Sequence, residues 1–434
     1  MLLILLHTLL HHTVADTHVA SEINTFGLKL LQHVPPDENI MISPFSICTA
    51  VAMLNAGTSG ETKKQIDSAF GWSDSTDLSG QYKDFLTKVE GSEKDKFTLS
   101  SNNRLYIDNT FTPLQSYSNE LTTNFGAEVE AVNFSNGDNS ATVEQINTWV
   151  EEKTNEKIQK LFSDIDGGVR AILINTIYFK AAWVDPFNEV ITQDAFYLDE
   201  EYAIKTDTMH LEESLPYFEN NDIELVKLPY ASEGSQRVSM VIIKPKTRAG
   251  LSSLEKKIGY QFSEVSSWMS SVEYILLDLS MPKFQFESGV DKLKEILIED
   301  FQVLDVFDEN KADLSGVSST EDLFVSFIKH KSFISVNENG TEAAAATAIG
   351  ISLTSVEIKP IPREVLVNQP FMFLIYDESN EVVLFVGRMV HPDSEKDSDK
   401  YLESRYISSG SSSSAKFAGQ SLLLCIIVAM VWIA

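Results

Sequence analysis

The sequence ENGTEAAAAT, Glu338 to Thr347, lies between two apolar segments with the character of strands, residues 323–336 and 370–379. The connection between them, residues 337–369, is long for a compact domain, and connections of this length are usually functional. Its composition is also unusual, because it opens on a run of small side chains. We therefore take this connection as the candidate functional segment.

The alanine run permits two interpretations. Local propensity alone favours a short surface helix with Thr341 as its N-cap, because alanine is the best helix former. As a strand, the same run would place four small side chains on one face, those of Thr341, Ala343, Ala345 and Thr347. Such a strand can enter a packed sheet with little steric hindrance. Gly340 can act as its hinge, because glycine accepts backbone angles that other residues avoid.

The rest of the chain separates helices from strands. Periodic apolar positions predict helices over residues 21–34, 43–57 and 141–159. From residue 171 onward, apolar runs predict strands over residues 171–183, 238–245, 274–286, 323–336, 370–379 and 381–390. This segregation favours an α+β fold.

Charge and cysteine content exclude several functions. The 434 residues carry 63 acidic and 34 basic side chains, a net charge of −29. Such a surface repels phosphate backbones and sulfated polysaccharides, so we expect neither nucleic acid nor heparin as a partner. Cys48 and Cys425 lie far apart in apolar segments and predict no disulfide framework.

The sequence contains no catalytic motif of the common kinds. The nucleophile elbow G-x-S-x-G, the phosphate-binding G-x-x-x-x-G-K and the zinc-binding H-E-x-x-H are absent. His330 is the one histidine in a strongly apolar strand context, where a hydrogen-bonded core histidine is more common than a catalyst. We therefore expect no enzyme activity, no cofactor and no metal site.

Both ends of the chain have the composition of targeting segments. Residues 1–20 begin with an apolar run and are expected to form a signal peptide. Residues 393–421 form a serine-rich polar linker, and the apolar tail 422–434 is shorter than the about 20 residues that span a membrane. Linker and tail match a glycosylphosphatidylinositol (GPI) attachment signal, with insertion of the tail itself as the alternative. We expect an extracellular protein attached to the outer cell surface.

Two sequons for N-glycosylation fit a secreted route. They begin at Asn133 and Asn339. We expect a glycan at Asn133. A glycan at Asn339 would obstruct the candidate hinge, so we expect that asparagine to be unmodified.

From about Ser21 to Pro392 the chain resembles the serpin family. The resemblance is carried by four segments: SPFSI (43–47), LINTIYFKAAW (173–183), VLVNQPFMFLI (365–375) and ENGTEAAAAT. It implies a serpin domain over residues 21–392, with a large central β-sheet, further sheets, about nine helices mostly in the N-terminal half, and an exposed reactive-centre loop. It also implies an inhibitor, expected to be monomeric, that forms a covalent acyl complex with a serine protease.

The resemblance assigns roles to individual residues. The inhibitory hinge comprises Glu338, Gly340, Thr341, Glu342, Ala343, Ala344, Ala345, Ala346 and Thr347. A hydrogen-bonded shutter that holds the central strands together comprises Ser43, Ser46, Asn175 and His330. At the breach, where the loop enters the sheet, the resemblance implies Trp183 and an ion pair of Lys283 with Glu338.

The position of the scissile bond stays open. The family's spacing from Gly340 places it at Thr354-Ser355, where Thr354 and Leu353 indicate an elastase- or chymotrypsin-like target. Counting back from NQPF places it as late as Lys359-Pro360, although a proline after the scissile bond hinders cleavage. Arg363 is a further basic candidate, but it is expected to lie in the strand after the loop.

A non-inhibitory serpin, acting as a carrier or chaperone, is the alternative function. Such proteins usually have bulky, charged or proline residues on the inserting face of the hinge. The four positions of that face in this chain carry only threonine and alanine. A plain binding module with a helical linker would leave the other three motifs unexplained.

Overall fold

The computed structural model describes residues 18–73, 75–90, 97–134, 139–232, 236–320, 322–342 and 361–392. Several predicted features lie outside these ranges. They are residues 1–17 of the signal peptide, the linker 393–421, the tail 422–434, the hinge residues Ala343, Ala344, Ala345, Ala346 and Thr347, and the scissile-bond candidates Leu353, Thr354, Ser355 and Lys359. Within the described ranges, no helix is long and apolar enough to cross a membrane.

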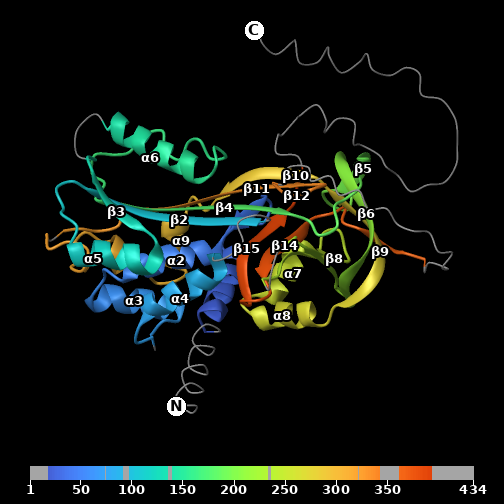
Figure 1. The fold of residues 1–434 in the computed structure, drawn as a ribbon, viewed down its shortest axis with the longest axis horizontal. Coiled ribbons are helices and arrows are strands. Elements are labelled where there is room, and N and C mark those ends of the chain that lie inside the picture. The colour runs from blue at the N-terminus through green and yellow to red at the C-terminus, as the bar shows by residue number, and fades with distance from the viewer. Residues whose placement is uncertain are drawn as a thin grey trace, which may run out of the picture.

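A six-stranded sheet forms the centre of the molecule and carries the candidate site. Its strand order is β10 (Phe284–Gly289), β11 (Phe327–Asn337), β12 (Gly340–Thr341), β4 (Ala171–Ala182), β2 (Phe97–Asp108) and β3 (Glu128–Val132). Strand β4 is buried along almost its whole length, as an apolar strand covered on both faces should be. Figure 1 shows helix α6 (Ser140–Lys153) over one face of this sheet and α2 (Pro44–Asn55) on the other.

A nine-stranded sheet packs beside the first. Its order is β1 (Ile40–Ile42), β15 (Val382–Met389), β14 (Phe371–Asp377), β8 (Val238–Pro245), β7 (Ile223–Pro229), β6 (Ala203–Glu219), β9 (Glu273–Pro282) and β13 (Arg363–Leu366), with β5 (Thr192–Tyr197) paired to β6. Strands β14 and β15 are buried at every position. They pair with each other as the two C-terminal strands predicted from the sequence.

The helices lie mainly in the N-terminal half. They comprise residues 18–31, α2, α3 (Gly60–Phe70), α4 (Leu78–Glu90), α5 (Gln115–Glu120), α6, α7 (Leu251–Ile258), α8 (Phe262–Ser270) and α9 (Leu293–Glu299). Helix α2 is buried at every residue, and the Ser43 side chain caps it by accepting a hydrogen bond from the Ser46 N–H. It packs under β2, β4 and β15. The α+β class with a large central sheet is therefore confirmed.

Several predicted elements differ in extent from the observed ones. Strand β11 begins at Phe327 rather than at residue 323, and the first helix spans residues 18–31 rather than 21–34. Helix α6 ends at Lys153 rather than at residue 159, because Asn155 and Glu156 take positive φ angles that break the helix. The predicted strand 274–286 divides into β9 and β10, which belong to different sheets. Lys283 lies at the break, where its N–H donates to the Asp207 carbonyl oxygen.

Candidate functional site

The start of the hinge is a strand. Thr341 pairs with Val336 of β11 on one side and with Ala181 of β4 on the other, and Gly340 pairs with Asn337 and Ala182. Thr341 is only 1% exposed. The interpretation of Thr341 as a helix N-cap is therefore wrong, because Thr341 pairs with two strands and the next residue, Glu342, has a positive φ angle.

Gly340 makes the turn from β11 into β12 possible. Its φ of 151° lies in a region that residues with a side chain rarely adopt. The turn itself, residues 338 and 339, has its carbonyl oxygens bonded to the N–H groups of Phe187 and Trp183. Strand β12 is therefore held at the sheet by main-chain contacts on every side.

Beyond β12, strands β4 and β11 pair directly with each other. They are parallel, from Phe327 opposite Ile172 to Ser332 opposite Ile177. Strand β12 runs antiparallel to both strands and separates them only at its own end of the sheet. The central sheet is thus open at one end, where the hinge enters, and closed at the other.

The residues predicted at the breach surround the point where β12 enters. The Lys283 ammonium lies 2.8 Å from the Glu338 carboxylate and lowers the pKa of that carboxyl. Trp183 donates from Nε1 to the Asn337 carbonyl oxygen at 3.0 Å. Its ring stacks on Tyr230 with centroids 4.5 Å apart.

Tyr230 is a contact that the sequence did not predict. Its hydroxyl lies 2.7 Å from Thr341 Oγ1, and both side chains are buried. Burial also raises the pKa of Tyr230 well above its usual range. The tyrosine therefore stays neutral and holds the first inserted side chain of the hinge.

The four predicted shutter residues form one buried hydrogen-bond network. The Ser43 N–H donates to Nε2 of His330 at 3.2 Å. Because Nε2 accepts, Nδ1 carries the proton and donates to Asn175 Oδ1 at 2.5 Å. Asn175 in turn donates from Nδ2 to the Ser46 carbonyl oxygen at 3.0 Å and to its hydroxyl.

Two further members of this network come from β2. Asn103 accepts from Asn175 Nδ2 at 2.5 Å, and the Ser101 hydroxyl lies 2.7 Å from that of Ser46. Their positions in an otherwise unremarkable polar stretch, LSSNN, gave no signal of this contact. The network therefore ties β2, β4, β11 and the start of α2 together.

Burial makes His330 a neutral histidine. Loss of solvent, assisted by the charge of Lys331, lowers the pKa of His330 to about 3. The ring therefore carries no charge near neutral pH, as its acceptor role at Nε2 requires. His330 and Asn175 are direct partners in the β11–β4 pairing, so their contact lies on the closed part of the sheet.

The remaining predicted site residues lie apart from this region. Arg363 begins β13, where it forms an ion pair with Glu219 at 2.7 Å. A residue held in a paired strand is poorly placed for cleavage, which disfavours Arg363 at the scissile bond. Asn133 lies directly after β3, and its carbonyl oxygen accepts from Thr142.

Comparisons with known proteins agree with this architecture. A family model described as Serpin (serine protease inhibitor) matches residues 21–392. A protein named serine protease inhibitor from Cyanea capillata is 33% identical over 370 residues, covering 82% of this chain and 93% of that protein. Leukocyte elastase inhibitor A of Mus musculus is 34% identical over 385 residues, covering 86% and 99%.

Solved structures show the same likeness. The crystal structure of a serpin from the insect Tenebrio molitor, described as highly specific, superposes with a TM-score of 0.75 at 30% identity. The match covers 87% of this chain and 98% of that one.

Proposed function

Because the chain belongs to the serpin family, we propose that it inhibits a serine protease irreversibly, as a suicide substrate whose cleaved loop inserts between β4 and β11. The position of β12 is the observation that carries this proposal. The loop already enters the sheet between the two strands that a further insertion would separate. Insertion of a serpin loop is itself a standard example of strand addition to a sheet.

The observed register predicts the path of insertion. Thr341 faces Ala181 and Val336, and each further residue advances one position along both strands in the opposite direction. Ala343 would then face Phe179 and Ile334, Ala345 would face Ile177 and Ser332, and Thr347 would face Asn175 and His330.

This path explains the small side chains of the hinge. Phe179, Ile177 and Ala181 belong to the main hydrophobic core, so residues opposite them point into the same packed layer. Protein interiors have no room for large additional side chains. Threonine and alanine at the inserting positions fit this limit, which supports an inhibitor rather than a carrier or chaperone.

The chemistry of inhibition follows from the timing of insertion. The protease's serine attacks the carbonyl carbon at the scissile bond and forms an acyl ester, while the amine of the next residue leaves. The freed hinge then inserts, carrying the attached protease with it, and must do so before water hydrolyses the ester. The His330–Asn175 contact lies on this path and must open.

Trapping of a covalent complex tests the proposal. The secreted chain is incubated with an elastase-like, a chymotrypsin-like and a trypsin-like protease. An SDS-stable band at the summed mass less that of the released C-terminal fragment, together with a large rise in melting temperature after loop cleavage, is the expected result. Cleavage by all three proteases with neither outcome would exclude an inhibitory serpin and favour the carrier function.

We further propose that the protein acts at the outer cell surface, held by a glycosylphosphatidylinositol anchor that replaces the tail 422–434. The composition of linker and tail supports this location. Release of the protein from intact cells by a phosphatidylinositol-specific phospholipase C is expected. Retention after that treatment would instead favour insertion of the tail.

A further inference from the structure

The first residue after β12, Glu342, leaves the sheet in an unusual conformation. Its φ is +55°, in the left-handed region that a residue with a side chain seldom adopts. Its N–H still donates to the Ser335 carbonyl oxygen at 2.8 Å. The main chain therefore follows β11 up to this residue, and the backbone bends at it.

The Glu342 side chain is charged, yet only 5% exposed. Its carboxylate lies 2.7 Å from the Lys157 ammonium. Burial, together with the neighbouring Glu342 carboxylate, raises the pKa of Tyr178 above its usual range. A buried carboxylate is stable only with such partners. The ion pair therefore holds Glu342 where it is.

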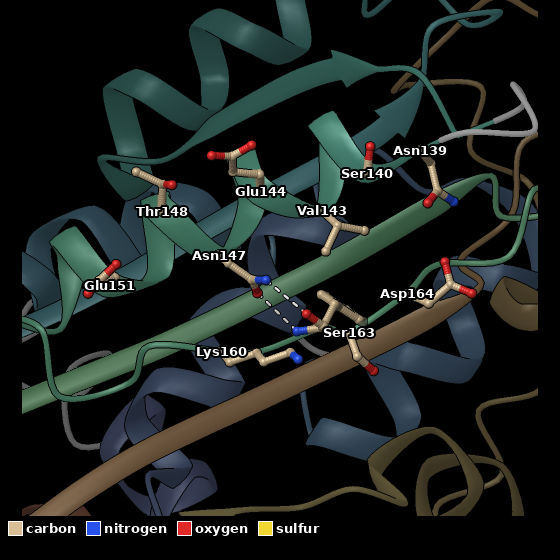
Figure 2. A pocket seen from close by; sticks show the side chains of 11 residues that line it. Asn139, Ser140, Val143, Glu144, Asn147, Thr148, Glu151, Lys160, Ser163 and Asp164 are labelled. Carbon is tan, nitrogen blue, oxygen red and sulfur yellow. Dashed lines mark hydrogen bonds between the residues drawn. The ribbon is translucent and has the colours of Figure 1, made fainter.

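Lys157 lies in a segment that is hydrogen-bonded to α6. Asn147 of α6 accepts from the Phe162 N–H and donates to the Phe162 carbonyl oxygen, at 3.0 and 2.8 Å (Figure 2). Asn147 also accepts from the Leu161 N–H at 2.9 Å. Thr154 also accepts from the Ile158 N–H. The buried side chains of Ile158 and Phe162 pack under α6.

The ion pair lies across the path of insertion. Lys157 Nζ lies 5.3 Å from the ring centroid of Phe333 on β11, whereas the Glu342 carboxylate lies near the Tyr178 hydroxyl on β4 and acts on its pKa. Tyr178 and Phe333 are the two residues that would face Ala344 in the inserted strand, by the register of β12. The pair thus lies between the two strands at the position of Ala344, the next residue that would share a face of the inserted strand with Glu342.

We propose that the Lys157–Glu342 ion pair is a latch that stops the uncleaved loop at Thr341 and delays its further insertion. For insertion, Glu342 has to change from the left-handed to the extended conformation and leave its present contact. The pair therefore stabilises the starting state. The biological role of this latch rests on the proposed function. Its effect on the rate of insertion can be measured without a protease.

The test compares Lys157→Ala, Glu342→Gln and the double variant with Lys160→Ala. Lys160 is the matched control, because it is a lysine of the same segment but lines the cleft of about 540 Å³ beside α6 (Figure 2). Each protein is held uncleaved at elevated temperature. The conversion to a form with an inserted loop, no longer cleavable by a non-target protease, is followed over time, as is amide exchange at residues 341 and 342.

Conversion about three- to tenfold faster in both single variants is expected, the range of a partly buried ion pair. The double variant should be no faster than either single one, and Lys160→Ala should match the wild type. Conversion at the wild-type rate, or slower, would overturn the latch. Additive effects in the double variant would also overturn it, because they indicate general destabilisation.

The same variants separate the latch from the proposed function. If the wild type forms a covalent complex, the latch predicts that Lys157→Ala needs fewer inhibitor molecules per protease inhibited, because insertion is faster. If no protease forms a complex, the proposed function fails. The conversion and exchange rates still show whether the ion pair delays insertion.

Discussion

His330 on β11 and Asn175 on β4 face each other across the closed part of the central sheet, with Nδ1 2.5 Å from Oδ1. The Ser43 N–H donates to the opposite ring nitrogen. The contact with Ser43 requires a neutral ring, because Nε2 has to accept, whereas Nδ1 donates to Asn175 in either protonation state. The Ser43–His330 contact therefore depends on pH, and so does the resistance of the sheet to opening.

The first prediction concerns acid. The pKa of His330 is about 3 in the folded protein and about 6.5 in the unfolded chain. Between these two values, His330 is protonated in the unfolded chain but not in the folded protein. Stability is therefore lost as pH falls from about 6.5 toward about 3. The slope due to this histidine is at most about 1.4 kcal/mol per pH unit.

Thermal unfolding of the wild type and His330→Gln, at pH 7 and pH 5, measures this effect. Other groups titrate in both proteins, so the informative quantity is the difference between the two pH dependences. We expect the wild type to lose more stability than the variant on acidification. Equal losses would contradict a neutral His330 in the folded protein.

The second prediction concerns Thr341. An arginine at this buried position would have to place a charge in the core beside Tyr230, so insertion should stall at its first residue. We expect Thr341→Arg to be cleaved by the target protease without forming an SDS-stable complex. Ala343→Pro should behave alike, because proline removes a donor from the new strand. Thr341→Ser is the control that should still form the complex.

The third prediction concerns Tyr230. Removing its hydroxyl in Tyr230→Phe leaves the buried Thr341 hydroxyl without this partner, at a cost of about 1–3 kcal/mol, while the ring stack on Trp183 is kept. A lower melting temperature and faster amide exchange at Thr341 are expected. When Thr341 is already replaced by alanine, Tyr230→Phe should lower the melting temperature by less than it does in the wild type. An unchanged exchange rate would show that the hydroxyl pair does not hold the hinge.

Sequence patterns predicted which motif residues belong to the site, but not which residues outside the motifs contact them. The motif-bearing residues Ser43, Ser46, Asn175 and His330 do lie together. In contrast, Tyr230 and Lys157 meet the hinge only through tertiary structure, and Tyr230 and Thr341 are 111 positions apart in sequence. No local pattern reports such a contact.

The alanine run shows the limit of local propensity more directly. Taken alone, TEAAAAT favours a helix. For Thr341, the first residue of this segment, pairing with β4 and β11 gives a strand instead, and β4 is far away in sequence. The division of residues 274–286 into β9 and β10 has the same origin, because each half pairs in a different sheet.

The fourth prediction concerns the scissile bond. The spacing from Gly340 places it at Thr354-Ser355, and the position of Arg363 inside β13 disfavours the latest candidate. Mass spectrometry of the C-terminal fragment released by an elastase-like protease should show Ser355 as its first residue. A fragment that begins at Pro360 would instead assign Lys359 and a trypsin-like target.

A change of specificity gives an independent check of the same bond. If Thr354 precedes the scissile bond, Thr354→Arg should make the chain an inhibitor of a trypsin-like protease and weaken it against an elastase-like one, because the side chain at this position fills the protease's specificity pocket. Lys359→Ala should leave both activities unchanged. Loss of inhibition in Lys359→Ala, with no gain in Thr354→Arg, would move the bond to Lys359. The hinge register would then have to accommodate a longer inserted segment, since the distance from Gly340 to the cleaved bond sets how far the strand extends past His330.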